Sequence, residues 1–270
     1  MPPFVRTLLR FAFRAVLSVP GVKFGVSKKV GPFGPFVMDG CFLFSDFSNW
    51  DSYKNSGFSI GVNSIRPGAV VLDVGAHVGL FAMPAAIAAG KNGAVVAFEP
   101  APRNVDLLRR HVRLNKLSNV EVVQTLLGDQ VRRDVEFHVA SRDSGLNSLA
   151  DTPKLKGSRK IGLPMISLDA FCFDRGLKPN LIKMDIEGGE LAALRGARNV
   201  LQRDRPLLLL SVHPWHLRQL GHSVEEVQDL LGELGYEVFD SDENRVETLG
   251  GHEYLVVPRE MEGNWCLTVL

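Results

Sequence analysis

Cysteine is scarce in this chain of 270 residues, which has only Cys41, Cys172 and Cys266. An odd, unpatterned set argues against a disulfide framework or a structural metal site and suits a reducing cytosol. The chain also lacks an excess of one charge, because 31 basic and 30 acidic residues leave a net charge of +1. Nucleic-acid binding needs a clustered basic stripe, so we expect a cytoplasmic protein with no nucleic-acid partner.

Internal repeats and long linkers are absent from the sequence as well. Apolar residues make up 45% of the chain, which is enough for a buried core. We therefore expect one α/β domain over residues 59–270, preceded by an N-terminal extension over residues 1–58. The sequence does not reveal the oligomeric state.

The extension begins with an amphipathic basic pattern over residues 4–19, in which Arg6, Arg10 and Arg14 share one helix face. This segment is too short and too charged to span a bilayer, and its arginines interrupt any signal-peptide core. Two interpretations stay open. The helix lies on an anionic membrane surface as a peripheral contact, or it packs on its own domain.

Aromatic residues are concentrated in the rest of the extension, since ten of the 16 phenylalanines lie within the first 58 residues. Gly31-Pro32 and Gly34-Pro35 break any helical period, so short strands or turns are expected here. Again two interpretations stay open: the segment forms a lid over a substrate, or its rings fill the gap beside the sheet.

The rest of the chain is organised around residues 70–83, which read VVLDVGAHVGLFAM. A buried strand ends at Asp73, and Gly75 and Gly79 then lead into an Ala-rich helix over residues 81–89. Glycine carries no Cβ, so the loop, which includes Ala76 and His77, is expected to let a ligand approach the backbone and the helix N-terminus.

A triple-glycine Gly-x-Gly-x-x-Gly turn, which a pyrophosphate requires, is missing from this loop. An acid before the glycines repels phosphate and attracts a cation, so Asp73 indicates a ligand with an amine. A second short strand, residues 95–98, ends in Glu99, which is placed to accept hydrogen bonds from ribose hydroxyls. An amine and a free ribose without phosphate describe S-adenosylmethionine, which we expect as the cofactor.

Four blocks of sequence resemble the FkbM-type methyltransferases: LDVGAHVGLF, AFEPAPRNVDLLRRHVRLN, NLIKMDIEGGELAALRGARNVL, and a strand ending in His-Pro. The resemblance covers about residues 49–258. It implies an S-adenosylmethionine-dependent O-methyltransferase with the class I, Rossmann-like fold, a seven-stranded sheet of order 3-2-1-4-5-7-6 whose seventh strand is antiparallel. It also implies that Asn55 reaches the cofactor and that Asp129, after the third strand, contacts the adenine.

The remaining elements follow from apolar periodicity and capping residues. We expect helices over residues 103–115, 190–201 and 224–234, and a short one begun by Ser167 and Asp169. Further strands are expected over residues 120–126, 181–184, 206–212, 236–239 and 254–258, with an extra one over 135–139. Residues 141–161 are polar and predict a surface loop.

The fourth strand ends in Asp185-Ile186-Glu187-Gly188-Gly189-Glu190, and the fifth ends in His213-Pro214. The carboxyl ends of adjacent parallel strands face one crevice, so these groups are expected to meet there. We expect Asp185 or His213 to be the base for an acceptor hydroxyl and Glu187 to orient the substrate. Related sequences usually carry an acid two positions before this histidine, where this chain has Ser211.

Metal binding is the alternative use of these acids, with a divalent ion held by Asp185, Glu187 and Glu190. No histidines stand at ligand spacing in the sequence, so we expect no metal. The predicted function is methyl transfer to a hydroxyl of a small molecule or glycan, such as a sugar, polysaccharide or polyketide. Two alternatives are a nicotinamide-dependent oxidoreductase and a non-catalytic membrane-associated module with a relic fold.

Overall fold

The structure is a computed structural model and describes residues 24–52, 55–139 and 159–261. The expected amphipathic helix over residues 4–19 lies outside the described residues, as does most of the expected loop over 141–161. Within the described ranges, no helix is both long enough and apolar enough to cross a membrane.

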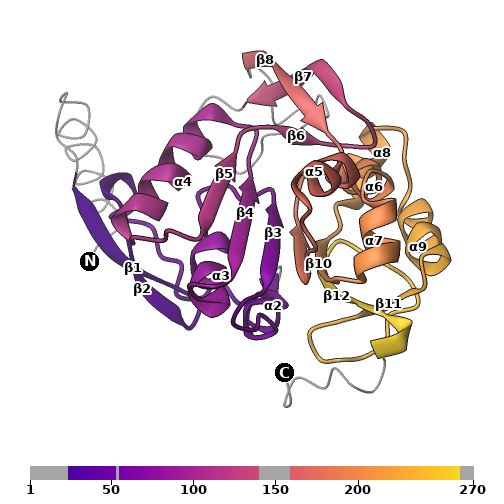
Figure 1. The fold of residues 1–270 in the computed structure, drawn as a ribbon, viewed down its shortest axis with the longest axis horizontal. Helices are drawn as coiled ribbons and strands as arrows, with labels where there is room; N and C mark the ends of the chain where they lie inside the picture. Colours follow the sequence, from indigo (N-terminus) through magenta and orange to yellow (C-terminus); the bar gives the residue numbers. More distant parts are fainter. Residues whose placement is uncertain (1–23, 53–54, 140–158, 262–270) are drawn as a thin grey trace, which may run out of the picture.

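A seven-stranded sheet forms the centre of the molecule (Figure 1). Its strands, in spatial order, are β5 (Val120–Val123), β4 (Ala94–Phe98), β3 (Val70–Val74), β9 (Leu181–Met184), β10 (Leu207–Ser211), β12 (Glu253–Pro258) and β11 (Tyr236–Phe239). Counted along the chain, this is the expected order 3-2-1-4-5-7-6. β12 runs antiparallel to both of its neighbours, whereas the first five strands are parallel. The class I fold expected from the sequence is therefore confirmed.

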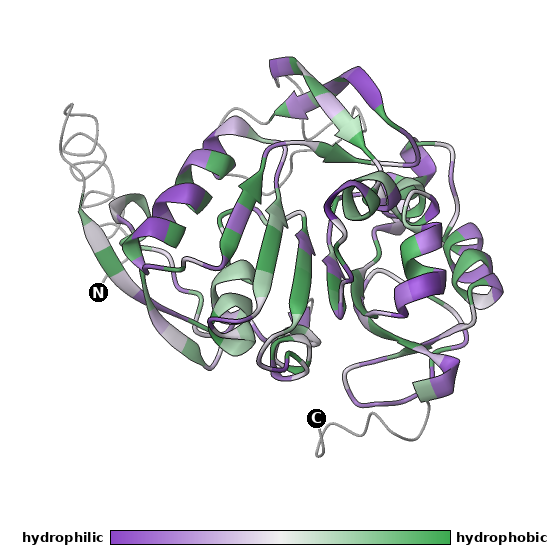
Figure 2. Ribbon diagram, viewed as in Figure 1, coloured by the Kyte–Doolittle hydropathy of each residue, from purple (hydrophilic) through white to green (hydrophobic). Residues whose placement is uncertain are grey.

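Helices cover both faces of this sheet, which is why its central strands are apolar on both sides (Figure 2). One face is packed by α2 (Phe58–Asn63), α3 (Ala82–Ala89) and α4 (Pro102–Leu114). The other is packed by α5 (Leu168–Arg175), α6 (Glu190–Arg195), α7 (Arg198–Asp204), α8 (Pro214–Gln219) and α9 (Val224–Glu233). These helices do not cover the carboxyl ends of the parallel strands, where a binding site can form.

The helix expected over residues 190–201 is broken into α6 and α7. Gly196 ends α6, and a Cβ at this position would lie 2.0 Å from the carbonyl oxygen of Gly128. The Asp169 carboxylate then accepts hydrogen bonds from the backbone amides of Asn199 and Val200 in α7. The single-helix prediction was wrong because close packing against a distant segment is invisible in the local pattern.

A second sheet of three strands lies beside the carboxyl edge of the main sheet. Its strands, in spatial order, are β6 (Leu126–Leu127), β8 (Arg159–Ile166) and β7 (Arg132–Val139). The third strand was expected to run to Leu126, but β5 ends at Val123 and the chain crosses to this small sheet. The extra strand over residues 135–139 is confirmed within β7, and β8 was not predicted.

The N-terminal segment forms an antiparallel hairpin of β1 (Gly25–Val30) and β2 (Phe33–Asp39), followed by a short 3-10 helix, η1 (Gly40–Phe42). A 3-10 turn, η4 (Arg259–Met261), follows β12. Phe36 and Met38 are buried in the same core as α3, so the hairpin rings fill space beside the sheet. Within the described part of the extension, Trp50, Asn55 and Phe58 line the cavity described below. A domain boundary at residue 58 stays a proposal.

Candidate active site

A cavity of about 590 Å³ opens at the carboxyl ends of β3, β4, β9 and β10. This size lies within the range of small-molecule sites. Its walls come from the segment before α2, the loop after β3, the ends of β4, β9 and β10, the small sheet and the start of β12. Asn55, Ala76, His77, Glu99, Asp185, Glu187 and His213 line it, so these predicted site residues are brought together.

The glycines of the first loop allow close packing of the chain around it. Gly75 has φ +84°, and a Cβ there would lie 1.9 Å from the backbone oxygen of Asp185. Gly79 has φ +93°, and its Cβ would meet Leu108 of α4 at 2.5 Å. Gly75 lines the cavity, but Gly79 is not among the described lining residues. The expected role of Gly79 in cofactor binding stays a prediction.

Asp73 lies beneath the cavity and is not among the described residues that line it. Its side chain is fully buried, and neither carboxylate oxygen has a hydrogen-bond partner within the described part of the chain. The nearest cation is Lys183 on β9, with Nζ 4.0 Å from Asp73 Oδ1. Burial raises the pKa of Asp73 to about 6, although Lys183 opposes the shift. The expected contact between Asp73 and a cofactor amine stays a prediction.

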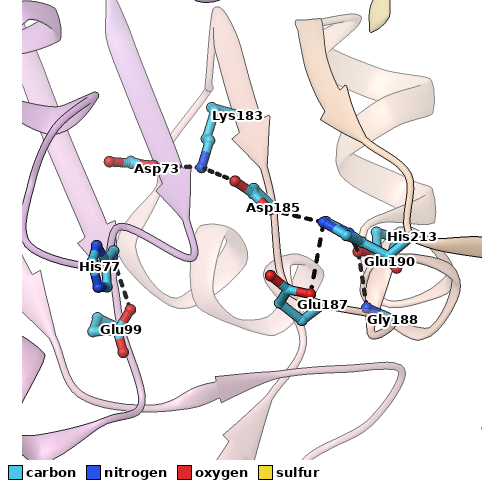
Figure 3. Close-up of polar contacts among 9 residues, drawn as sticks. All are labelled: Asp73, His77, Glu99, Lys183, Asp185, Glu187, Gly188, Glu190 and His213. Atoms are coloured by element: carbon cyan, nitrogen blue, oxygen red, sulfur yellow. Dashed lines mark hydrogen bonds and ion pairs between the residues drawn. The ribbon is translucent and has the colours of Figure 1, made fainter. Parts of the chain in front are cut away.

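Glu99 lies at the end of β4 and faces the cavity, as predicted. Its Oε2 accepts from the backbone N–H of His77 at 2.8 Å, and its Oε1 accepts from the amide of Ala101 and the side chain of Asn104 (Figure 3). Burial raises the pKa of Glu99 to about 7, against these three donors. The carboxylate is thus fixed in place and retains lone pairs for a ligand's hydroxyl groups.

Asp129 is not among the described residues that line the cavity, and its expected contact with the adenine stays a prediction. Its side chain is exposed and lies 3.5 Å from Arg132. Because β5 ends early, the wall at this place is formed by residues 125–127, which cross toward the small sheet. Leu126 and Leu127 are buried and give this wall an apolar surface.

Asp185, Glu187 and His213, hereafter the triad, converge at the ends of β9 and β10 (Figure 3). His213 Nε2 lies 3.5 Å from Asp185 Oδ1 and 3.8 Å from Glu187 Oε2. Lys183 holds the other oxygen of Asp185, at 3.3 Å. The expected meeting of the two strand ends is confirmed.

Glu190 is the partner of His213 that sequence spacing could not reveal. It is fully buried at the start of α6, and its Oε1 accepts from His213 Nδ1 at 2.7 Å and from the Gly188 amide at 3.0 Å. Burial alone would lower the pKa of His213, but the bond to Glu190 and the charges of the three acids raise it to about 9. At neutral pH the imidazole in this arrangement is therefore protonated on both nitrogens and carries a positive charge.

Four further residues shape the triad's side of the cavity and were not predicted: Trp215, His216, His252 and Glu253. His216 Nδ1 lies 3.2 Å from Glu187 Oε2. Trp215 is 44% exposed and presents an aromatic surface. The Trp-His pair directly after His213-Pro214 is the only signal in the sequence that could have indicated this wall.

Residues 73–238, more than half of the chain, match the family model described as the methyltransferase FkbM domain. No curated protein sequence matches the chain significantly. The matched range runs from Asp73 to Val238 and so includes the glycine loop, Glu99 and the triad.

Three solved structures are similar to this chain. The methyltransferase FkbM from Methylobacillus flagellatus is 20% identical, with 75% of this chain and 51% of that chain covered and a TM-score of 0.45. The precorrin-6y C5,15-methyltransferase from Geobacter metallireducens is 12% identical, with coverages of 76% and 88% and a TM-score of 0.43. A SAM-dependent methyltransferase from Aquifex aeolicus is 16% identical, with coverages of 77% and 95% and a TM-score of 0.41. This chain spans about half the length of the Methylobacillus protein.

Proposed function

The chain belongs to the FkbM methyltransferase family, and on that basis we propose that it transfers a methyl group from S-adenosylmethionine to a hydroxyl oxygen of a small molecule or glycan. The observation that carries the proposal is the layout of the cavity. A fixed carboxylate, Glu99, lies on one side, and the triad lies on the other.

The residues present suit S-adenosylmethionine. The Glu99 carboxylate can accept from both ribose hydroxyls, and the apolar wall of Leu126 and Leu127 suits the flat face of an adenine. The carboxylates of Asp185 and Glu187 line the same cavity and suit a ligand that carries positive charge. When bound, the cofactor supplies an electrophilic methyl group on its sulfonium.

Methyl transfer requires the acceptor oxygen to lie in line with the methyl carbon and the sulfur. An O–C bond forms, the C–S bond breaks, and the hydroxyl proton leaves. Positioning contributes about 7–11 kcal/mol to such reactions, whereas a general base contributes about 10²–10⁴-fold. The main task of the cavity is therefore to hold the acceptor in line.

The proton passes to the triad. His213 already carries a proton at neutral pH because the acids around it raise its pKa to about 9. The group that accepts the hydroxyl proton is then a carboxylate, Asp185 or Glu187, and His213 neutralises the charge that both carry. Trp50 and Trp215 add ring faces to this part of the cavity, which suits the apolar face of a sugar or polyketide.

Incubation of cell extract with the full chain and methyl-labelled S-adenosylmethionine tests the proposal. We expect label in glycan, lipid or small-molecule fractions as an alkali-stable ether, and no transfer by Asp185→Asn. Label that is released by alkali as methanol would show ester formation instead. Label confined to RNA or protein would overturn the proposed acceptor class.

A further inference from the structure

The three side chains of the triad each direct one donor atom to a common point in the cavity wall. Nε2 of His213 and one oxygen each of Asp185 and Glu187 all lie within 4.8 Å of one another. An ion bound between donors at about 2.1 Å brings neighbouring donors to roughly 3 Å. The observed separations of 3.5 Å and 3.8 Å from Nε2 need only a small contraction to meet that geometry.

Two of these donors are already oriented by groups on their far sides. Lys183 holds Asp185 Oδ2, which leaves Oδ1 directed toward His213. The fully buried Glu190 accepts the Nδ1–H of His213, which selects the tautomer whose Nε2 carries a lone pair. A carboxylate behind a histidine is the usual support of a metal-ligating imidazole. Without a bound cation, a proton occupies the lone pair of His213 Nε2.

A separate observation at the same cavity also indicates a cationic ligand. Glu253 at the start of β12 is only 4% exposed and lines the cavity. Its Oε2 is buried and has no hydrogen-bond partner among the residues that the structure describes. Glu253 pairs in register with Ser211, two residues before His213, so this carboxylate, whose charge Lys183 offsets only in part, lies on the side of the cavity that holds the triad.

We propose that Asp185, Glu187 and His213 bind a divalent cation of the Mg²⁺ or Mn²⁺ class. Two carboxylates and one imidazole, without thiolates, are a donor set for these ions, and they leave coordination positions for water and ligand oxygens. When bound, the cation would lower the pKa of the acceptor hydroxyl, whose proton would leave to a carboxylate oxygen of Asp185 or Glu187 that the cation does not bind. The cation site is inferred from the geometry alone, whereas activation of the acceptor hydroxyl by the cation rests on the proposed methyl transfer.

The donor set differs from the one that the sequence suggested. Glu190 is the third acid of the motif. Its carboxylate binds His213 Nδ1 and points away from the place where the donor oxygens of Asp185 and Glu187 converge. His213 replaces it as the third ligand, from a different strand, which is why no ligand spacing is visible in the sequence.

Electron paramagnetic resonance of Mn²⁺ titrated into the chelator-treated full chain tests the site. We expect one bound Mn²⁺ per chain, displaced by Mg²⁺, and at least tenfold weaker binding in Asp185→Asn, Glu187→Gln and His213→Ala. His252→Ala is the matched control, because His252 lines the same cavity outside the triad, and it should bind as the parent does. Absence of binding at millimolar Mn²⁺, or equal binding in the triad variants, would overturn the proposal.

Glu190→Gln tests the positioning residue. It should weaken Mn²⁺ binding by about 10–100-fold and leave S-adenosylmethionine binding unchanged, as expected for a group that acts through a ligand. Unchanged Mn²⁺ affinity in this variant would contradict the assigned role of Glu190. S-adenosylmethionine binding measured in the presence of chelator separates the two proposals. If the chain does not bind S-adenosylmethionine, the methyltransferase function is contradicted. If it does not bind Mn²⁺, only the cation site is contradicted.

Discussion

Glu99 is buried against three N–H donors, and burial and the charge of Asp73 both disfavour its ionised form, so the pKa of this carboxyl lies near neutral pH. Burial raises its pKa from 4.5 to about 7, so the folded chain holds the proton more tightly than the unfolded chain. This contribution to stability is fully present below pH 4.5 and is lost as the pH rises through about 7. Burial shifts the pKa of Glu253 in the same direction, also to about 7.

Denaturant unfolding of the cofactor-free chain at pH 5 and pH 8 measures this effect. We expect the unfolding free energy of the parent to fall by about 2 kcal/mol more than that of Glu99→Gln, which has no proton to lose. Parallel pH profiles for the two proteins would show that Glu99 does not titrate in this range.

His111 on α4 joins the N-terminal hairpin to the main domain. Its Nδ1–H donates to the Val78 carbonyl at 2.8 Å, and its Nε2 accepts from the Asp39 amide at 2.9 Å. Burial lowers the pKa of His111, which keeps the ring neutral as this pair of bonds requires. The stability from this arrangement is present above pH 6.5 and is lost as the pH falls through the lowered value. Arg110 adds an ion pair with Asp39 at 2.7 Å.

Comparison of His111→Ala with Arg110→Ala separates the two contributions. His111→Ala leaves two backbone groups without partners and should cost about 3 kcal/mol of unfolding free energy at neutral pH. Arg110→Ala removes a partly exposed ion pair and a long hydrogen bond to the Phe24 carbonyl and should cost about 1 kcal/mol. Urea unfolding measures both. Equal losses would mean that the histidine does not anchor the hairpin.

Gly75 and Gly68 offer a matched pair for the loop after β3. Both have positive φ, +84° and +89°, but a Cβ at Gly75 would lie 1.9 Å from the Asp185 oxygen, while one at Gly68 meets nothing within 4 Å. We expect Gly68→Ala to cost about 1–2 kcal/mol through its backbone conformation alone. Gly75→Ala should cost well over 3 kcal/mol or prevent folding, as measured by urea unfolding. Similar losses would place β9 farther from this loop than the structure does.

The central strands of the main sheet were predictable because each is a short, mostly apolar run buried on both faces. β9 and β11 begin and end at the predicted residues. The small sheet was harder, since the exposed positions of β8 that alternate with buried Leu163 and Met165 are Gly162 and Pro164, residues that usually indicate a turn. The early end of β5 follows from this sheet.

At the site, too, some residues could be predicted from the sequence and others could not. Glu99, Asp185 and His213 could be identified because a parallel sheet gathers the carboxyl ends of its strands in one crevice. The contact between Glu190 and His213 joins residues 23 positions apart through the fit of α6 against the end of β10, which no local pattern encodes. Likewise, the role of Gly75 depends on a backbone oxygen 110 residues away.

The cavity as a whole depends on segments from both halves of the chain, from Trp50 to Glu253. If the cavity is the site for S-adenosylmethionine, it binds one cofactor per chain and Glu99 holds the ribose. Two charge-assisted hydrogen bonds to the ribose contribute about 3 kcal/mol together, which corresponds to about 100-fold in affinity. Glu121 on the neighbouring β5 is exposed and serves as the matched acid-to-amide control.

Calorimetric titration of the full chain with S-adenosylmethionine is the most direct test of this account. We expect saturable binding at one site, about 100-fold weaker in Glu99→Gln and unchanged in Glu121→Gln. No saturable binding by the parent chain, or an affinity of Glu99→Gln within threefold of the parent, would contradict it.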